Sequence, residues 1–387
     1  MSLFQSFITM YIPNEYPSWC TSIFLITIIL CIIIYSIHLF SKSKCPTNIP
    51  RTNIRGIPAN YQYMNEYLCN FIIKSSHASC TLGNFKNDYV NLCMLESVIK
   101  QGCRFLDFEI YAVDNKPVVA TSTLKSNYEK GSFNSIELSH VLKCVYDKAI
   151  SPINQGKPSC PNAYDPLFLH FRLKTSIKEV YNAIASDIST ILSSVLLSND
   201  YNLDNMSNYS NNLWKTLKLQ DVMGKVIIIV DKIDSVVQDS HLYEIVNINS
   251  SDVNTNLIRT NDITYTMTNG TTPSNVYYTE PNQDKMTVVL PTIHQRPMNY
   301  DAVKCFSLGI QICTMCFQKK DKLLDKYNKQ FNERQSAFII KNYFNPDVDL
   351  YRPVAVTSMP TLQNNNVSVQ MTTESNRVMP SNTIVFK

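Results

Sequence analysis

Glycine is scarce in this sequence, with only eight residues among 387. No glycine-rich phosphate-binding loop of the Walker or Rossmann type is present. The net charge of +4 is too small to indicate a nucleic-acid partner. A hydrophobic fraction of 44%, with 22 Tyr and 17 Phe, argues against general disorder. The sequence therefore indicates a folded protein that binds no nucleic acid.

Lysine and arginine are absent from the first 41 residues, and residues 19–40 contain no charged side chain. At a rise of 1.5 Å per residue, such a run spans a hydrocarbon core about 30 Å thick. A cleaved signal peptide is the alternative. Against it, the run is longer than a signal-peptide core, no basic residue precedes it, and no small-x-small cleavage site follows. We predict a transmembrane helix at 19–40, in contact with the lipid bilayer, after a short extracytosolic segment at 1–18.

Basic residues appear directly after this run, and they bear on its orientation. By the positive-inside rule, they place the N-terminus outside and the main domain in the cytosol. In the cytosol, the ten cysteines beyond Cys31 are expected to be free thiols. The opposite orientation would instead predict disulfides and permit glycosylation of the Asn-X-Ser/Thr sites. The basic residues are Lys42, Lys44, Arg51 and Arg55, and the sites begin at Asn205, Asn208, Asn249, Asn269 and Asn366.

The remaining chain divides by composition and periodicity. Strand-like and helix-like runs alternate over 67–233 and again over 284–350, which predicts a parallel sheet with helical crossovers. The segment 234–283 is polar and rich in Asn, Thr and Ser, and we interpret it as an insert. Residues 41–66 are interpreted as a linker and 351–387 as a loosely ordered tail.

Several short motifs occur in a fixed order in the first alternating region. Ser75-Ser76-His77 is followed by Gly102-Cys103-Arg104, which leads to the acids Asp107 and Glu109. Pro117-Val118-Val119 comes next. This order resembles the X half of the catalytic domain of phosphoinositide-specific phospholipase C.

The second alternating region resembles the Y half of the same family. It contains Met286–Pro291, Asn299-Tyr300, Gly309, Gln311 and Phe317-Gln318 in the family's order. The resemblance implies an α/β fold, a distorted TIM-type (β/α)8 barrel preceded by the N-terminal transmembrane helix. It also implies a site at the C-terminal ends of the strands.

The resemblance assigns remnants of a catalytic site. His77 matches the first catalytic histidine of the family. Asp107 and Glu109 match its two acids in reversed order, as remnant Ca²⁺ ligands. Because they are separated by one residue on a strand, their side chains point to one face.

Three changes from the family pattern alter this site. Ala78 stands where the family has a Ca²⁺-binding Asn, and Arg172 stands where it has a Glu ligand. The second histidine is absent, because residues 120–122 are Ala, Thr and Ser. A guanidinium about 4 Å from a divalent cation, at an effective dielectric of about 20, would repel it by several kcal/mol. Arg172 could instead pair with Asp107 or Glu109.

The family's phosphate-gripping residues are also replaced, so no substrate-binding residue is assigned. The replacements are Ile229 and Asp231 for two Lys, and Val288 and Leu290 for an Arg and a Tyr.

These substitutions favour a membrane-anchored, catalytically inactive phospholipase-C-like protein without a cofactor, acting as a structural or interaction module with an unidentified protein partner. Abundant Asn, Ile, Lys, Tyr and Ser have AT-rich codons, which suggests a large DNA virus or a protist and a viral or host internal membrane. The alternative is an active, Ca²⁺-dependent phosphoric diester hydrolase that cleaves the glycerol–phosphate bond of phosphatidylinositol lipids. A third hypothesis, a glycosylated surface adhesin, requires the opposite orientation.

Overall fold

The computed structural model divides the chain into two units, Met1–Tyr351 and Arg352–Lys387, and the fold belongs to the first. The predicted segments 1–18 and 351–387 lie almost wholly outside the described residues. The residues that the structure describes are 18–123, 128–150, 160–205, 213–251, 255–259, 282, 285–346 and 350–352.

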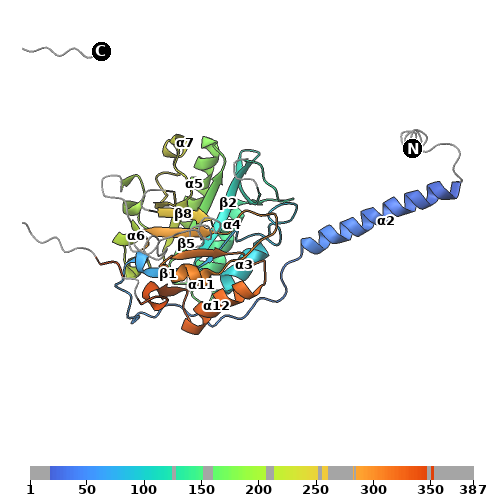
Figure 1. Ribbon diagram of the computed structural model, residues 1–387. Helices are drawn as coiled ribbons and strands as arrows, with labels where there is room; N and C mark the ends of the chain where they lie inside the picture. Colours follow the sequence, from blue (N-terminus) through green and yellow to red (C-terminus); the bar gives the residue numbers. More distant parts are fainter. Residues whose placement is uncertain are drawn as a thin grey trace, which may run out of the picture. The chain divides into compact units, whose positions relative to one another are not determined.

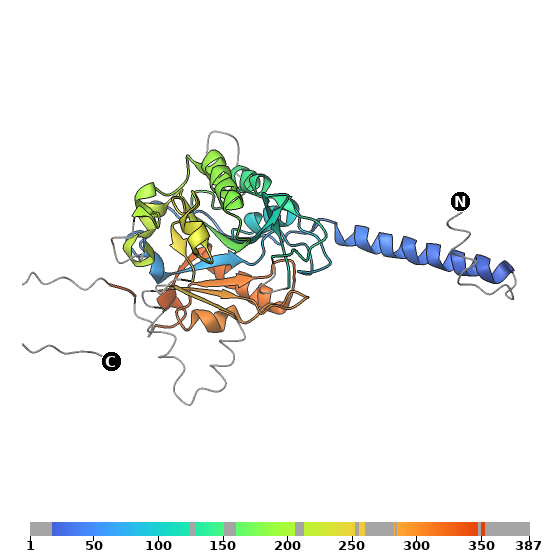
Figure 2. The same ribbon diagram turned by 90° about the horizontal axis from the view of Figure 1, so that it is seen from above.

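One long apolar helix, α2 (Ser18–Lys42), matches the predicted membrane segment at 19–40. Its length and composition suffice to cross a membrane, a property that signal sequences share. No charged side chain interrupts it before Lys42, which lies in its last turn. The helix is visible in blue in Figures 1 and 2.

Eight parallel strands form the sheet of the barrel, in the order β7-β6-β5-β2-β1-β10-β9-β8. They alternate with helices, which confirms the predicted α/β architecture. The parallel strands are β1 (Phe71–Ser76), β2 (Phe105–Val113), β5 (Leu167–Lys174), β6 (Val226–Val230), β7 (Ile248–Asn249), β8 (Thr255–Arg259), β9 (Met286–Leu290) and β10 (Ile312–Met315). Three antiparallel strands attach to them: β3 (Lys116–Ala120), β4 (Ile136–Glu137) and β11 (Phe338–Ile340).

The barrel is open at one edge. Among the described residues no ladder joins β7 to β8, the two ends of the parallel path. A side-chain bond links the two segments there, from Thr255 Oγ1 to the Asn249 carbonyl at 3.0 Å. The sheet is therefore a distorted TIM-type barrel rather than a fully closed one.

Helices surround the strands, with α5 on one side and α11 and α12 on another (Figures 1 and 2). Helices α3 and α12 begin at side-chain caps, Asn91 and Asp321, whose oxygens accept backbone N–H groups of the first turn. The helices are α3 (Leu92–Lys100), α4 (Leu138–Val145), α5 (Lys178–Leu192), α6 (Leu213–Thr216), α7 (Ser235–Gln238), α11 (Ala302–Phe306) and α12 (Lys322–Arg334). Short helical turns are η1 (Leu68–Asn70), η2 (Tyr146–Ile150), η4 (Asn199–Tyr201), η6 (Leu219–Val222) and η7 (Lys341–Tyr343).

The interpretation of 234–283 as an insert is wrong for part of that segment. It contains β7 and β8, and β8 pairs with β9 over five residues, Thr255 to Arg259. These strands are short or polar, so their hydrophobic pattern is weak. The segment therefore supplies two strands of the barrel, and its residues 260–281 lie outside the described part.

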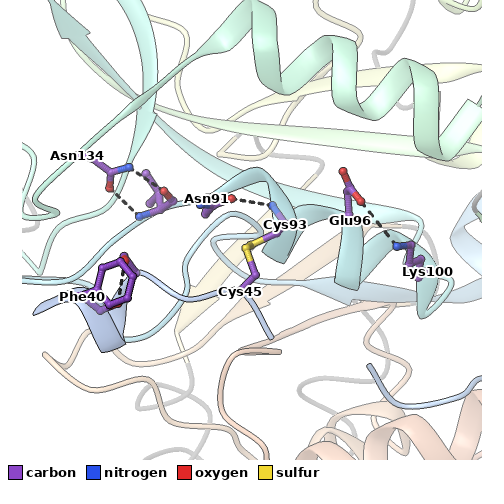
Figure 3. Close-up of a disulfide and its surroundings, with 9 residues drawn as sticks. Phe40, Cys45, Asn91, Cys93, Glu96, Lys100 and Asn134 are labelled. Atoms are coloured by element: carbon purple, nitrogen blue, oxygen red, sulfur yellow. Dashed lines mark hydrogen bonds and ion pairs between the residues drawn. A yellow bond between two sulfur atoms is a disulfide. The ribbon is translucent and has the colours of Figure 1, made fainter. Parts of the chain in front are cut away.

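Residues 41–66, interpreted as a linker, are attached to the barrel. The expectation that all ten cysteines beyond Cys31 are thiols is wrong. Cys45 forms a disulfide with Cys93 in the first turn of α3 (Figure 3). Further along, Ile54 is buried against the barrel. The other eight cysteines are free and buried, as expected of thiols that pack as small apolar groups: Cys69, Cys80, Cys103, Cys144, Cys160, Cys305, Cys313 and Cys316.

Candidate functional site

Asp107 lies at the centre of a buried polar cluster inside the barrel, and strand β2 positions it. Its Oδ1 accepts hydrogen bonds from Arg172 Nε at 2.9 Å and lies 2.9 Å from His170 Nδ1. Its Oδ2 accepts from Arg172 Nη2 and from the backbone N–H of Ala78, each at 2.9 Å. Both carboxylate oxygens of Asp107 are therefore fully engaged by the protein itself.

Glu109, two residues along β2, faces the same guanidinium. Arg172 Nη1 donates to Glu109 Oε1, while Glu109 Oε2 accepts from Tyr111 Oη at 2.8 Å and from the backbone N–H of Ser122 at 3.0 Å. The strand register explains the contact, because Arg172 on β5 stands opposite Glu109 on β2. Arg172 thus binds both acids, whereas the sequence suggested a pair with Asp107 or Glu109.

His170 and Ser250 extend the cluster toward the open edge of the barrel. His170 Nε2 lies 2.9 Å from Ser250 Oγ, and Ser250 directly follows β7. Because an ionised Asp107 can only accept, His170 Nδ1 carries the proton on that side. Ser250 was not predicted, since it lies in the segment interpreted as an insert and shows no motif of its own.

His77 and Ala78 form the turn after β1. Nδ1 of His77 lies 2.9 Å from Asp107 Oδ2, but its alignment does not make a hydrogen bond. Ala78 has a φ of 44°, the left-handed region that Asn tolerates better than Ala. The turn therefore keeps the backbone that suits the family's Asn while lacking its side-chain oxygen. Ala78 packs instead in an apolar group with Phe85 and Cys316.

Burial closes the whole cluster from solvent. The exposed fractions are 0% for Asp107 and His170, 3% for Arg172, 5% for His77 and 6% for Glu109. Groups this deep cannot contact a lipid head group without a rearrangement of the surrounding loops.

The pKa values of the cluster reflect a tight internal ion pair. Burial alone would raise the pKa of Asp107, but Arg172, His77 and the His170 hydrogen bond together hold that pKa well below its usual range. Burial disfavours the charged guanidinium, yet the two acids raise the pKa of Arg172 above its ordinary value. Burial lowers the pKa of His77, although Asp107 opposes the shift. Asp107 and Arg172 are therefore both charged at neutral pH.

These residues do not fit a Ca²⁺ ion. Such an ion needs six to eight oxygen ligands, and the guanidinium already takes three of the four carboxylate oxygens that Asp107 and Glu109 offer. Across the described ranges, no three His, Cys, Asp or Glu side chains converge on a point where a metal could bind. Ala78 adds no oxygen donor.

The loop that would hold the second histidine lies beside the acids. Thr121 and Ser122 are buried there, and Ser122 contributes its backbone N–H to Glu109. Neither residue type moves a proton at neutral pH as an imidazole does. Residues 120–122 therefore place no imidazole beside the acids.

The structure shows the surroundings of the four residues that stand at the family's phosphate-gripping positions. Ile229, Val288 and Leu290 are buried apolar residues of the sheet. Asp231 accepts a hydrogen bond from the backbone N–H of Leu173 at 2.8 Å. These four positions serve the barrel's core and backbone.

The motif residues that remain also serve the scaffold. Fully buried Arg104 donates to the carbonyls of Ala149, Asp165 and Pro166. Gln311 donates to three backbone carbonyls and accepts from the N–H of Thr287. Arg104 and Gln311, two residues of the family motifs, therefore hold the fold together.

Comparison with known proteins supports the fold. Residues 64–232 match the family model of phosphatidylinositol-specific phospholipase C, X domain. No curated protein matches the chain. The match covers the X-like half, and β9 and β10 of the Y-like half continue the same sheet.

Solved structures share the fold. L. pealei PLC21 is 14% identical with a TM-score of 0.55, over 72% of this chain and 37% of that one. S. officinalis PLC21 is 13% identical with a TM-score of 0.56, over 76% of this chain and 39% of that one. This chain spans less than two fifths of either structure, and at such identities the likeness concerns the fold alone.

Proposed function

We propose that this chain, which carries a divergent X domain of phosphatidylinositol-specific phospholipase C in a TIM-type barrel, is a membrane-anchored protein that does not hydrolyse phosphoinositides. It acts as a structural or interaction module. One observation carries the proposal: Arg172 binds both Asp107 and Glu109, where the family holds a metal. The internal cation satisfies the acids and leaves them unavailable to Ca²⁺.

The chemistry of the family supports this reading. Its reaction depends on a metal that stabilises the charged transition state and on a general acid/base pair. Here the metal ligands are paired with Arg172, and His77 is buried without a partner imidazole. Loss of one acid/base group alone typically costs a factor of about 10²–10⁴ in rate.

We expect the purified full chain to release inositol phosphate from phosphatidylinositol vesicles at the background rate, with or without Ca²⁺. The measurement is release of radiolabelled inositol phosphate over hours, with a known phospholipase C as positive control. Calcium-dependent release that His77→Ala abolishes would show that the chain is a working enzyme.

The alternative, an active phospholipase C, rests on one observation. His77 Nδ1 still lies 2.9 Å from an Asp107 oxygen, and a small realignment would let that acid orient the histidine by a hydrogen bond. Activity would then require Arg172 to leave both carboxylates and Ca²⁺ to replace it. The hydrolysis assay distinguishes the two functions.

For the membrane, we propose that α2 spans the bilayer with the N-terminus outside and the barrel in the cytosol. The support is the charge asymmetry, since Lys42, Lys44, Arg51 and Arg55 follow the apolar run and no Lys or Arg precedes it. A viral or host internal membrane is the setting suggested by the abundance of Asn, Ile, Lys, Tyr and Ser, residues with AT-rich codons.

We expect protease added to sealed microsomes, cytosolic face outward, to digest the barrel. A lumenal marker protein serves as the control for sealing. A barrel that survives until detergent is added, or that shifts in mobility after glycosidase treatment, would reverse the orientation. Asn205 is a suitable reporter for glycosylation because it is exposed.

A further inference from the structure

Residues 43–58, here called the strap, connect α2 to the barrel and are fixed to it at both ends. The lower strap, residues 52–58, makes several contacts. Thr52 Oγ1 donates to Asn332 Oδ1 at 2.8 Å, the Arg55 N–H donates to the Gln335 carbonyl at 2.9 Å, and Ile54 is 3% exposed. The lower strap therefore docks through backbone and core contacts that do not depend on a disulfide.

The upper strap, residues 43–51, is held differently. Apart from the Cys45–Cys93 disulfide, the upper strap is bonded to the barrel through the exposed hydrogen bond from Lys320 Nζ to the Asn48 carbonyl at 2.8 Å. An exposed polar bond of this kind contributes little net stability. The disulfide is the main attachment of the upper strap.

The upper strap covers a cavity of mixed lining. A space of ≈ 140 Å³ lies beneath Pro46 and Pro50, and its barrel side combines the apolar Leu82, Met94, Phe317 and Leu324 with the polar Ser97, Gln101, Gln318 and Lys320. The barrel side therefore presents a partly apolar surface between α3 and α12, and the strap is its occupant in this structure.

The disulfide is placed where a reductant can reach it. Cys45 is exposed and Cys93 is half-buried at the start of α3, beside the capping residue Asn91 (Figure 3). All eight other cysteines of the barrel are buried. Thiol–disulfide exchange depends on access, so Cys45–Cys93 is the bond that a thiol attacks. Exposed disulfides in a reducing compartment are typically transient or redox-sensing.

We propose that Cys45–Cys93 is a redox-responsive clasp that keeps the upper strap over the cavity between α3 and α12. Reduction takes two electrons and two protons from a dithiol, which itself becomes a disulfide, and leaves two protein thiols. The upper strap then detaches while the lower strap stays docked. Detachment uncovers the cavity. Once the exposed bond from Lys42 Nζ to the Asn87 carbonyl also opens, detachment gives about nine residues of slack, a reach of roughly 30 Å, between the membrane helix and the barrel.

The test is limited trypsin digestion of the full chain in lipid nanodiscs, with and without a phosphine reductant, read by mass spectrometry. Peptide mapping of the oxidised chain should first show Cys45 linked to Cys93. Reduction should speed cleavage after Lys44 and Arg51 by about tenfold or more, because cleavage follows local opening. Cleavage after Arg55, in the lower strap, should not change.

Single variants distinguish release of the clasp from a general loosening of the fold. Cys45→Ser and Cys93→Ser should each reproduce the reduced pattern without reductant, whereas Cys144→Ser, at a buried unpaired thiol, should behave like the wild type. An oxidised chain without the cross-link, or equal cleavage after Lys44 in both redox states, would overturn the proposal. Neither result depends on phosphoinositide hydrolysis, so the clasp and the proposed function fail separately.

Discussion

Replacing Arg172 by Met is expected to lower the free energy of unfolding at pH 7 by about 3–5 kcal/mol. The guanidinium is 3% exposed and forms three hydrogen bonds to Asp107 and Glu109. Removing it leaves two buried carboxylates without a counter-charge, and the desolvation cost of each then falls on the folded state. Chemical denaturation of wild type and variant measures the difference.

The difference in the free energy of unfolding between the wild type and Arg172→Met should become smaller as the pH falls. In the wild type the folded-state pKa of Asp107 is depressed. Its contribution to the free energy of unfolding is therefore present above the unfolded-state pKa of about 3.9, and it is lost as the pH falls through the folded-state pKa. In the Met variant the unpaired acids bind protons more readily when folded, so acid stabilises it relative to the wild type. Arg55→Met, at an exposed side chain, is the control and should change stability by about 0.5 kcal/mol or less. A loss that is equally small for both variants would mean that the buried ion pair is not formed.

The double variant Ala78→Asn, Arg172→Glu is expected to acquire Ca²⁺-dependent stability that the wild type lacks. It removes the competing cation and adds two oxygen donors beside Asp107 and Glu109, the ligand type that Ca²⁺ prefers. The φ of 44° at residue 78 accepts Asn readily. At a Ca²⁺ concentration 100 times its dissociation constant, the gain is about 2.7 kcal/mol.

Thermal unfolding with Ca²⁺ or with a chelator measures this gain. Ala78→Asn alone is the matched control, since Arg172 still binds the acids, and its Tm should not respond to Ca²⁺. If Ca²⁺ does not change the Tm of the double variant, then Asp107 and Glu109 do not form a cation site. Turnover should stay at background, because residues 120–122 supply no imidazole.

Much of the barrel could be predicted because its signals are local. The strand pattern around Asp107 and Glu109 and the motif order identify β2 and its neighbours, and a separation of two residues on a strand predicts that both acids face one side. Arg172 could be placed opposite them only through the family resemblance. That it binds both acids at once depends on the parallel register of β2 and β5, which the sequence does not specify.

The missed features depend on contacts between distant segments. Strand β8 has two apolar residues in five, Leu257 and Ile258, so its composition gives little indication that it pairs with β9. Ser250 joins the site only because β7 lies beside β6. The disulfide was missed for a different reason: the expected cytosolic location argued against it, while the fold brings Cys45 and Cys93 to a Cα–Cα distance of 5.9 Å.

The central claim is that Arg172 occupies the place of the metal, and calorimetric titration of Ca²⁺ into the wild-type chain tests it most directly. Two acids that already bind an arginine are a poor site, so no binding tighter than about millimolar is expected. Mg²⁺ titrated in parallel controls for weak surface binding. A 1:1 site of micromolar affinity, lost in Asp107→Asn, would contradict the account, because the guanidinium would then have to yield to the ion.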